Sequence, residues 1–125
     1  MKSVTFLIPV FNEVKTIEKA ILEIIDIKDI DKEIIIIDNF STDGTIQILK
    51  KFISYKNITI IFKDKNLGYG DSIKKGFNLA KKDLIYIQYG DLEYPIDGFY
   101  KMLKKFNQTN ADVVFGERYE KFSIK

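Results

Sequence analysis

Five short apolar runs, separated by segments with helical spacing, constrain the fold of this 125-residue chain more than any other feature of its sequence. The runs cover residues 4–8, 33–37, 58–62, 84–88 and 113–115. They are almost continuously apolar rather than alternating, which is typical of strands buried on both faces of a parallel sheet. We therefore predict five strands in a mainly parallel sheet that is covered by helices.

Between these runs, apolar residues recur at spacings of three, four or seven, which place side chains on one face of a helix. The four segments cover residues 17–25, 46–53, 73–80 and 96–106. Ser41 or Thr42 is suited to cap the second helix, and Pro95 to the first turn of the fourth. The alternation of strands and helices predicts an α/β fold with an open, doubly wound sheet, in a single domain of residues 1–125.

The composition narrows the chemistry that this chain can perform. It contains no cysteine and no histidine, so a site must use carboxylates, amides, Lys, Arg, Tyr and backbone groups. The longest aliphatic run covers only residues 34–37, far fewer than the roughly 20 residues that cross a bilayer, and we expect no transmembrane segment. The net charge is +2 and the lysine pairs follow helical patterns, which favours a solvated surface over a nucleic-acid site.

Polar side chains follow the predicted strands at the edge where such sheets bind ligands. Asp38 ends a run of isoleucines, so its carboxylate needs hydrogen-bond partners. For Asp38 we favour contact with a nucleotide base or ribose over helix capping. Asp43 stands just before Gly44 and Thr45, and for this residue we favour capping.

Asp91 and Glu93 follow the fourth predicted strand and are separated by one residue. Their side chains project to the same side if the extended backbone continues beyond the strand. Paired carboxylates suit Mg²⁺ or Mn²⁺, particularly when a diphosphate supplies further ligands. The alternative is that Glu93 caps the following helix and Asp91 lies in a turn.

Arg118 follows the fifth predicted strand. Its planar guanidinium is suited to the phosphate oxygens of a donor or an acceptor. An ion pair with Glu117 or Glu120 on the surface is an equal alternative. The sequence leaves both interpretations open.

Two glycines, Gly68 and Gly70, open the third predicted helix and let the backbone approach a ligand or a neighbouring strand. The pattern is a weak dinucleotide fingerprint, because Ile73 stands where a third glycine is expected. For Gly76 we favour close packing of the helix on the sheet.

Together, these segments resemble glycosyltransferase family 2, whose members are inverting nucleotide-sugar transferases with a glycosyltransferase-A fold. The resemblance covers nearly the whole chain. It is carried by IPVFNE (8–13), IIIIDNFSTDGT (34–45), NLGYGDSIKKG (66–76), YGDLEYP (89–95) and FGERY (115–119). The LEYP and GERY endings are most similar to the branch of dolichyl-phosphate mannosyltransferases and undecaprenyl-phosphate glycosyltransferases.

The resemblance implies a nucleotide site that contains Pro9, Phe11, Glu13, Asp38, Asn39, Gly68 and Asp91. Asn39 stands where this family often has a second aspartate. Asp91 matches the last acid of the family's Asp-x-Asp metal motif, with Glu93 as its helper, whereas Tyr89 occupies the place of the first acid. A phenol with a reference pKa of about 10 is a poor metal ligand at neutral pH. We therefore expect Mg²⁺ or Mn²⁺ to bind weakly without nucleotide.

The resemblance also implies an activity, namely inverting transfer of a hexose from a UDP- or GDP-sugar to a polyprenyl phosphate or a glycan in glycan or cell-envelope biosynthesis. It places the protein in the cytoplasm, with peripheral association at the membrane face if the acceptor is a lipid. The family's acceptor-binding segment and usual catalytic base come after the last residue, Lys125, so we expect a truncated donor-binding domain and assign no catalytic residue. The alternative is a non-catalytic nucleotide-binding or partner-docking module of the same fold.

Overall fold

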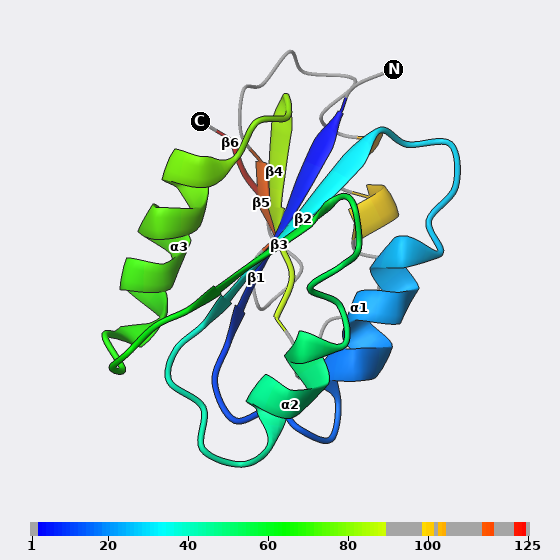
Figure 1. The fold of residues 1–125 in the computed structure, drawn as a ribbon. Coiled ribbons are helices and arrows are strands. Elements are labelled where there is room, and N and C mark those ends of the chain that lie inside the picture. The colour runs from blue at the N-terminus through cyan, green and yellow to red at the C-terminus, as the bar shows by residue number, and fades with distance from the viewer. Residues whose placement is uncertain (1–2, 90–98, 102, 105–113, 117–121, 125) are drawn as a thin grey trace.

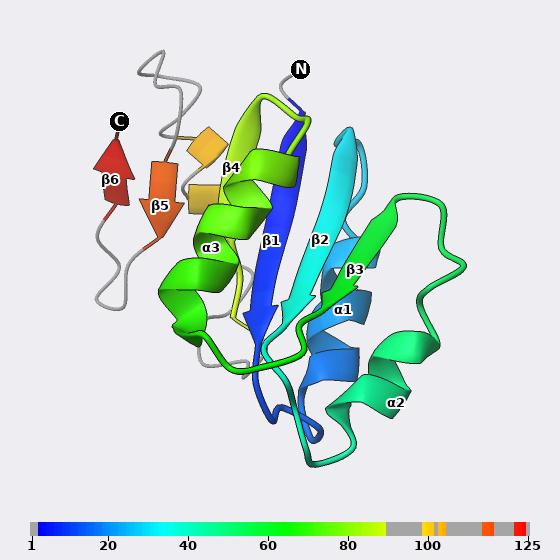
Figure 2. The same ribbon diagram turned by 60° about the vertical axis from the view of Figure 1, so that its left-hand side comes forward.

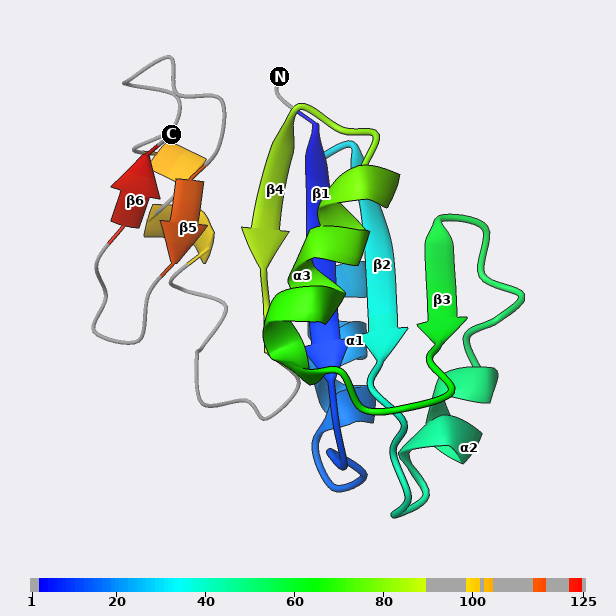
Figure 3. The same ribbon diagram turned by 90° about the vertical axis from the view of Figure 1, so that its left-hand side faces the viewer.

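The structure, a computed structural model, describes residues 3–89, 99–101, 103–104, 114–116 and 122–124. Its main sheet contains, in spatial order, β3 (Ile58–Phe62), β2 (Lys32–Asp38), β1 (Val4–Val10) and β4 (Leu84–Ile87). Every neighbouring pair is parallel, and Figure 3 shows the four strands pointing the same way. The prediction of a parallel sheet is confirmed.

Helices cover both faces of this sheet. Helices α1 (Ile17–Ile25) and α2 (Thr45–Lys50) lie on one face and α3 (Gly68–Leu79) on the other, as Figures 1 and 2 show. The chain therefore winds in opposite directions on the two sides of β1, which confirms the doubly wound topology. Residues 99–101 and 103–104 are also helical, but Pro95 lies outside the described residues. None of the described helices has the length and apolar character needed to span a membrane.

Side-chain alternation along the strands divides the core into two layers. Phe6 and Ile36 belong to the layer beneath α1 and α2, whereas Leu7 and Ile35 belong to the layer beneath α3. All seven residues of β1 are buried. This burial on both faces explains why the sequence of β1 is almost continuously apolar.

Helix α3 packs closely on β1 at Gly76. A Cβ atom added to this buried glycine would lie 2.2 Å from Cδ1 of Leu7, a side chain that is itself fully buried. Only a residue without a side chain fits there, and the prediction of close packing at Gly76 is confirmed.

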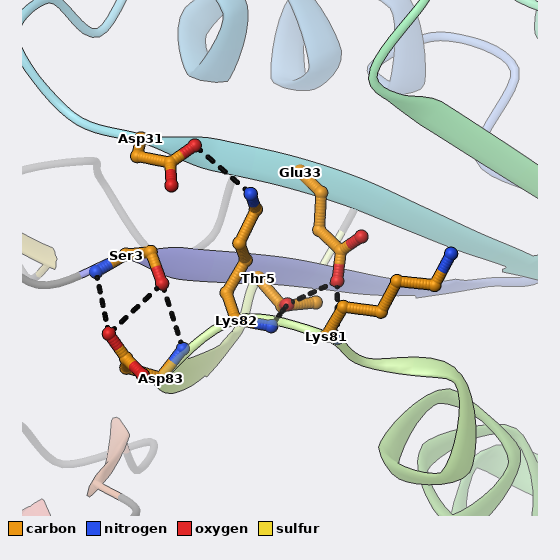
Figure 4. A network of polar contacts seen from close by, with 7 residues as sticks. All are labelled: Ser3, Thr5, Asp31, Glu33, Lys81, Lys82 and Asp83. Atoms are coloured by element: carbon orange, nitrogen blue, oxygen red, sulfur yellow. Dashed lines mark hydrogen bonds and ion pairs between the residues drawn. The ribbon is translucent and has the colours of Figure 1, made fainter.

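A polar network fixes the amino-terminal edge of the sheet, as Figure 4 shows. The Thr5 hydroxyl donates to Glu33 Oε1 at 2.6 Å, and the same oxygen accepts the backbone N–H of Lys81 at 2.7 Å. Ser3 Oγ accepts the backbone N–H of Asp83 at 2.9 Å. These bonds tie the loop between α3 and β4 to the first residues of β1 and β2.

The fifth predicted strand forms, but it does not belong to the main sheet. Strand β5 (Val114–Gly116) pairs antiparallel with β6 (Phe122–Ile124), a strand that we did not predict. A partner only a few residues away along the chain costs little loop-closure entropy. The prediction of a five-stranded sheet was therefore wrong in this respect.

Candidate functional site

The loops that follow β1 and β2 are joined by hydrogen bonds at the carboxyl edge of the sheet. Asn12 has a left-handed backbone with φ 52°, which asparagine tolerates better than most residues. Its backbone N–H donates to Ser41 Oγ at 2.9 Å, and its Oδ1 accepts the N–H of Thr42 at 2.7 Å. The backbone N–H of Glu13 donates to Thr45 Oγ1 at 3.0 Å. The sequence analysis did not assign Asn12 a role of its own, although an asparagine after a buried strand is a signal for such a turn.

Asp38 ends β2 and is fully buried. The Ser41 hydroxyl donates to its Oδ1 at 2.6 Å, and the Ser41 backbone N–H donates to Oδ2 at 3.1 Å. These two bonds offset the desolvation of the carboxylate. The N-cap residue of α2 is Gly44, and the Ser41 hydroxyl bonds to Asp38 instead of to the helix. The predicted cap at Ser41 or Thr42 was therefore wrong.

Asp43 supports the start of α2, as the favoured interpretation predicted. Its Oδ1 accepts the backbone N–H of Thr45 at 3.0 Å and the Thr45 hydroxyl at 2.6 Å, while Oδ2 accepts the N–H of Val14 at 3.3 Å. Desolvation by itself would raise the pKa of Asp43, but the hydrogen bonds from Thr45 and Val14 hold that pKa below its ordinary value. The carboxylate thus satisfies a donor that the first turn of a helix leaves unpaired.

Asn39 joins the end of β2 to the start of α3. Its side chain is buried, with the residue only 2% exposed. Nδ2 donates to Asn66 Oδ1 at 2.6 Å, and Oδ1 accepts the backbone N–H of Leu67 at 3.0 Å. Asn66 Oδ1 also accepts the backbone N–H of Gly68 at 2.9 Å. The two asparagines together pair the first backbone donors of α3.

Gly68 begins α3 with a positive φ of 87°. No heavy atom would lie within 4 Å of a Cβ placed there, so the backbone conformation, and not lack of space, favours glycine at this position. A group can therefore approach Gly68 on the side that a Cβ would occupy.

Lys63 holds the end of β3 against α3. The residue is 8% exposed, and its Nζ lies 2.6 Å from Asp71 Oδ2 and 3.2 Å from Ser72 Oγ. The hydrogen bond from Lys63 lowers the pKa of Asp71 below its ordinary value. Lys63 is not among the predicted site residues, because a lysine after an apolar run usually points into solvent. A groove of about 590 Å³ beside this pair is lined by Phe62, Lys63, Asp64, Leu67, Asp71, Lys74, Lys75 and Asn78.

Tyr89 follows β4 and packs against the first turn of α3. Its ring lies edge-on to that of Tyr69, with the centroids 5.8 Å apart. The residue in the place of the metal motif's first acid thus takes part in an aromatic contact. Within the described part of the chain, no three His, Cys, Asp or Glu side chains form a group that could hold a metal ion. The predicted ligands Asp91 and Glu93, and also Arg118, lie outside the described residues.

The remaining predicted site residues lie on β1 and in the loop after it. Pro9 is buried and stands opposite Ile37 in the register of β1 and β2. Phe11 and Glu13 are half-buried. Figure 3 shows that the loops after β1, β2 and β3 all lie at one edge of the sheet. The fold therefore brings to this edge six of the predicted residues, namely Pro9, Phe11, Glu13, Asp38, Asn39 and Gly68.

This arrangement of strands and helices is the fold of a known class of transferase. The structure of a mannosyltransferase from Pyrobaculum calidifontis, solved in complex with GDP-Man and Mn²⁺, matches with a TM-score of 0.76 and 20% identity. The match covers 88% of this chain and 34% of the mannosyltransferase. The likeness shows the fold, and it confirms the Rossmann-like architecture of the glycosyltransferase-A type.

The chain belongs to glycosyl transferase family 2, whose family model matches residues 5–124. An uncharacterized protein of Methanocaldococcus jannaschii is 38% identical over 122 residues, which are 90% of this chain and 50% of that protein. The dolichol-phosphate mannosyltransferase of Pyrococcus furiosus is 25% identical over 119 residues, which are 94% of this chain and 34% of that enzyme. The chain thus spans between a third and a half of the length of these relatives.

Proposed function

We propose that this chain is a single donor-binding domain of a glycosyltransferase and that it binds a UDP- or GDP-sugar at the carboxyl edge of its sheet. The observation that carries the proposal is the family match over residues 5–124. The geometry supports it, because the loops at this edge are already joined by hydrogen bonds. A site that is ordered before binding loses less conformational entropy when the ligand arrives.

The proposed nucleotide site combines residues from three chain segments. Pro9, Phe11 and Glu13 come from β1 and its loop, Asp38 and Asn39 from the end of β2, and Gly68 from the start of α3. Each Asp38 oxygen accepts one bond from Ser41, and a carboxylate oxygen has a second lone pair for a ligand donor. Because Asp38 is fully buried, a direct contact with base or ribose requires the turn at Ser41 to open.

Metal binding in this proposal depends on Asp91, with Glu93 as a weaker helper. Carboxylate oxygens are the ligands that Mg²⁺ and Mn²⁺ prefer, and such an ion neutralises charge on a diphosphate. The Pyrobaculum mannosyltransferase structure contains Mn²⁺. Tyr89 brings no charge at neutral pH, so most of the coordination shell falls to water and diphosphate. Metal and nucleotide should therefore bind cooperatively.

We propose transfer to an acceptor as the activity of the whole protein. The Pyrococcus relative is named a dolichol-phosphate mannosyltransferase, which supports a polyprenyl phosphate as the acceptor at the cytoplasmic membrane face, with a glycan as the other choice. An ionised phosphate oxygen can attack the anomeric carbon without a strong base, inverting the sugar as the nucleoside diphosphate leaves. We propose Arg118 on the phosphate or acceptor side.

A second candidate function is a non-catalytic nucleotide-binding or partner-docking module. The observation in its favour is Tyr89, which occupies the place of the first acid of the metal motif and packs against Tyr69. Slow hydrolysis of a nucleotide sugar would favour the enzyme. Nucleotide binding without any turnover would favour the module.

The donor proposal is tested by thermal unfolding and calorimetric titration with UDP, GDP and their sugars, with and without Mn²⁺. A ligand at 100 times its Kd adds about 2.7 kcal/mol of stability, which shifts the Tm of a domain of this size by several degrees. We expect one nucleotide series to give this shift and to respond to Mn²⁺. No shift in either series would refute donor binding.

Two substitutions at the metal motif should act in opposite directions. Asp91→Asn removes the main carboxylate, so it should abolish the Mn²⁺-dependent part of nucleotide binding. Tyr89→Asp restores the missing acid and should strengthen Mn²⁺ binding. Tyr69→Leu is the matched control, since it removes the same ring contact without adding an acid. Unchanged metal dependence in Asp91→Asn would assign the two acids to the turn and the helix cap.

A further inference from the structure

Two adjacent residues at the end of β2 serve opposite faces of the sheet. Asp38 bonds to Ser41, in the loop that leads to α2 on one face. Asn39 bonds to Asn66 and Leu67, in the loop that leads to α3 on the other face. Successive side chains of an extended strand point in opposite directions. The two residues therefore hold two different loops, and Asn39 controls only the one that opens α3.

The hydrogen bonds of Asn39 require an amide. Its Nδ2 must donate to Asn66 Oδ1, while its Oδ1 must accept the N–H of Leu67. Asn66 Oδ1 is already an acceptor for Gly68, so the Asn66 amide cannot flip to present its Nδ2 as a donor without giving up that bond. An ionised aspartate at position 39 would place two acceptor oxygens against each other, where donor and acceptor now lie 2.6 Å apart. Aspartate is thus a poor substitute for asparagine at this position.

We propose that Asn39 is a positioning residue, which holds residues 66–68 in place at the nucleotide edge and acts on the nucleotide through Gly68. This inference rests on the proposed function and gives Asn39 a specific role within it. Both functional groups of the Asn39 side chain are engaged with the protein, and the residue is almost fully buried. The element that it orders is the start of α3, where a ligand could approach Gly68 on the side that a Cβ would occupy, since no heavy atom lies within 4 Å of that position apart from the chain neighbours.

Nucleotide affinity should depend on this link because of the entropy of the loop. When the link is intact, the first turn of α3 is ordered before the ligand binds. Without it, residues 66–68 must be ordered at the moment of binding, and that cost is subtracted from the affinity. Loss of the Asn39 to Asn66 bond should therefore raise the Kd for the nucleotide. Repulsion between the two oxygens should also loosen the bonds that the amides of Leu67 and Gly68 make to these side chains.

The test compares Asn39→Asp with Asn66→Asp. Both variants add one negative charge to the same contact. Asn66→Asp keeps an acceptor for Asn39 Nδ2 and for the N–H of Gly68, whereas Asn39→Asp removes the donor. Thr5→Val is the stability control, since it removes the hydrogen bond to Glu33 at the opposite edge of the sheet and leaves α3 in place.

We expect Asn39→Asp to bind UDP or GDP about tenfold more weakly than Asn66→Asp, the equivalent of one lost hydrogen bond. Amide hydrogen exchange at Leu67 and Gly68 should be faster in Asn39→Asp only. Equal affinities and equal exchange in the two aspartate variants would overturn the proposal. So would an equal loss of affinity in Thr5→Val, because the effect would then be one of global stability. If the unsubstituted chain binds neither nucleotide, the proposed function fails, while the exchange measurement still decides whether Asn39 holds the loop.

Discussion

The two edges of the parallel sheet both carry polar networks, but one network connects paired strands and the other connects loops. At the amino edge, Thr5 and Glu33 bond to the loop that enters β4, as Figure 4 shows. They join segments that the sheet already holds side by side. At the carboxyl edge, Ser41 and Asn39 link the loop after β2 to the loops after β1 and β3.

This difference predicts how each network contributes to stability and to ligand binding. An amino-edge network that reinforces strand pairing adds to stability and offers nothing to a ligand. A carboxyl-edge network that orders loops prepares the surface where ligands of such sheets bind. We therefore expect substitutions at the carboxyl edge to affect both stability and nucleotide affinity, and those at the amino edge to affect stability alone.

The largest effect is expected for Asp38→Ala. The substitution leaves the hydroxyl and the N–H of buried Ser41 without their acceptor, at a cost of about 2–3 kcal/mol in unfolding free energy. Nucleotide affinity should fall as well, because the turn that joins the β1 and β2 loops is loosened. Chemical denaturation and calorimetric titration measure the two effects. A stable variant with full affinity would remove Asp38 from the site.

A smaller effect, confined to stability, is expected for Thr5→Val at the amino edge. Valine preserves the shape of this fully buried residue but loses the 2.6 Å bond to Glu33, which should cost about 1 kcal/mol of unfolding free energy. The Kd for UDP or GDP should remain that of the unsubstituted chain. A changed Kd would show that the two edges are coupled and that the amino edge does not affect stability alone.

The smallest effect is a pH dependence at the carboxyl edge. The hydrogen bond from Lys63 lowers the pKa of Asp71 in the folded chain, so the pair stabilises the fold above the unfolded value of about 3.9. This contribution should be lost as the pH falls from about 4 through the lower folded pKa. Unfolding curves between pH 6 and pH 2, in steps of about 0.5, should show a weaker acid dependence in Asp71→Asn. Lys63→Met should weaken the acid dependence similarly, because it removes the cause of the pKa shift. If both variants keep the acid dependence of the unsubstituted chain, the Lys63–Asp71 pair does not contribute to it.

The sequence predicted those features that depend on local periodicity. Continuous apolar runs identified the strands of the parallel sheet, and spacings of three and four identified α1 and α3. The position of Asp43 before Gly44 was enough to predict its support of α2. The family's motifs brought Pro9, Phe11 and Gly68 into one proposed site, and the fold places them at one edge.

Only the tertiary structure decided which loops pair with one another. The bonds from Asn12 to Ser41 and from Asn39 to Asn66 span 29 and 27 residues, and they form because the register places Val10 beside Asp38 and Asp38 beside Phe62. Lys63 was missed for a different reason, since a lysine after an apolar run usually points into solvent, whereas here it turns to Asp71 and Ser72 on the helix that follows. Strand β5 pairs with β6 and not with a strand of the main sheet. A local pattern specifies which face a side chain occupies, but the partner on that face is set by how distant segments are brought together.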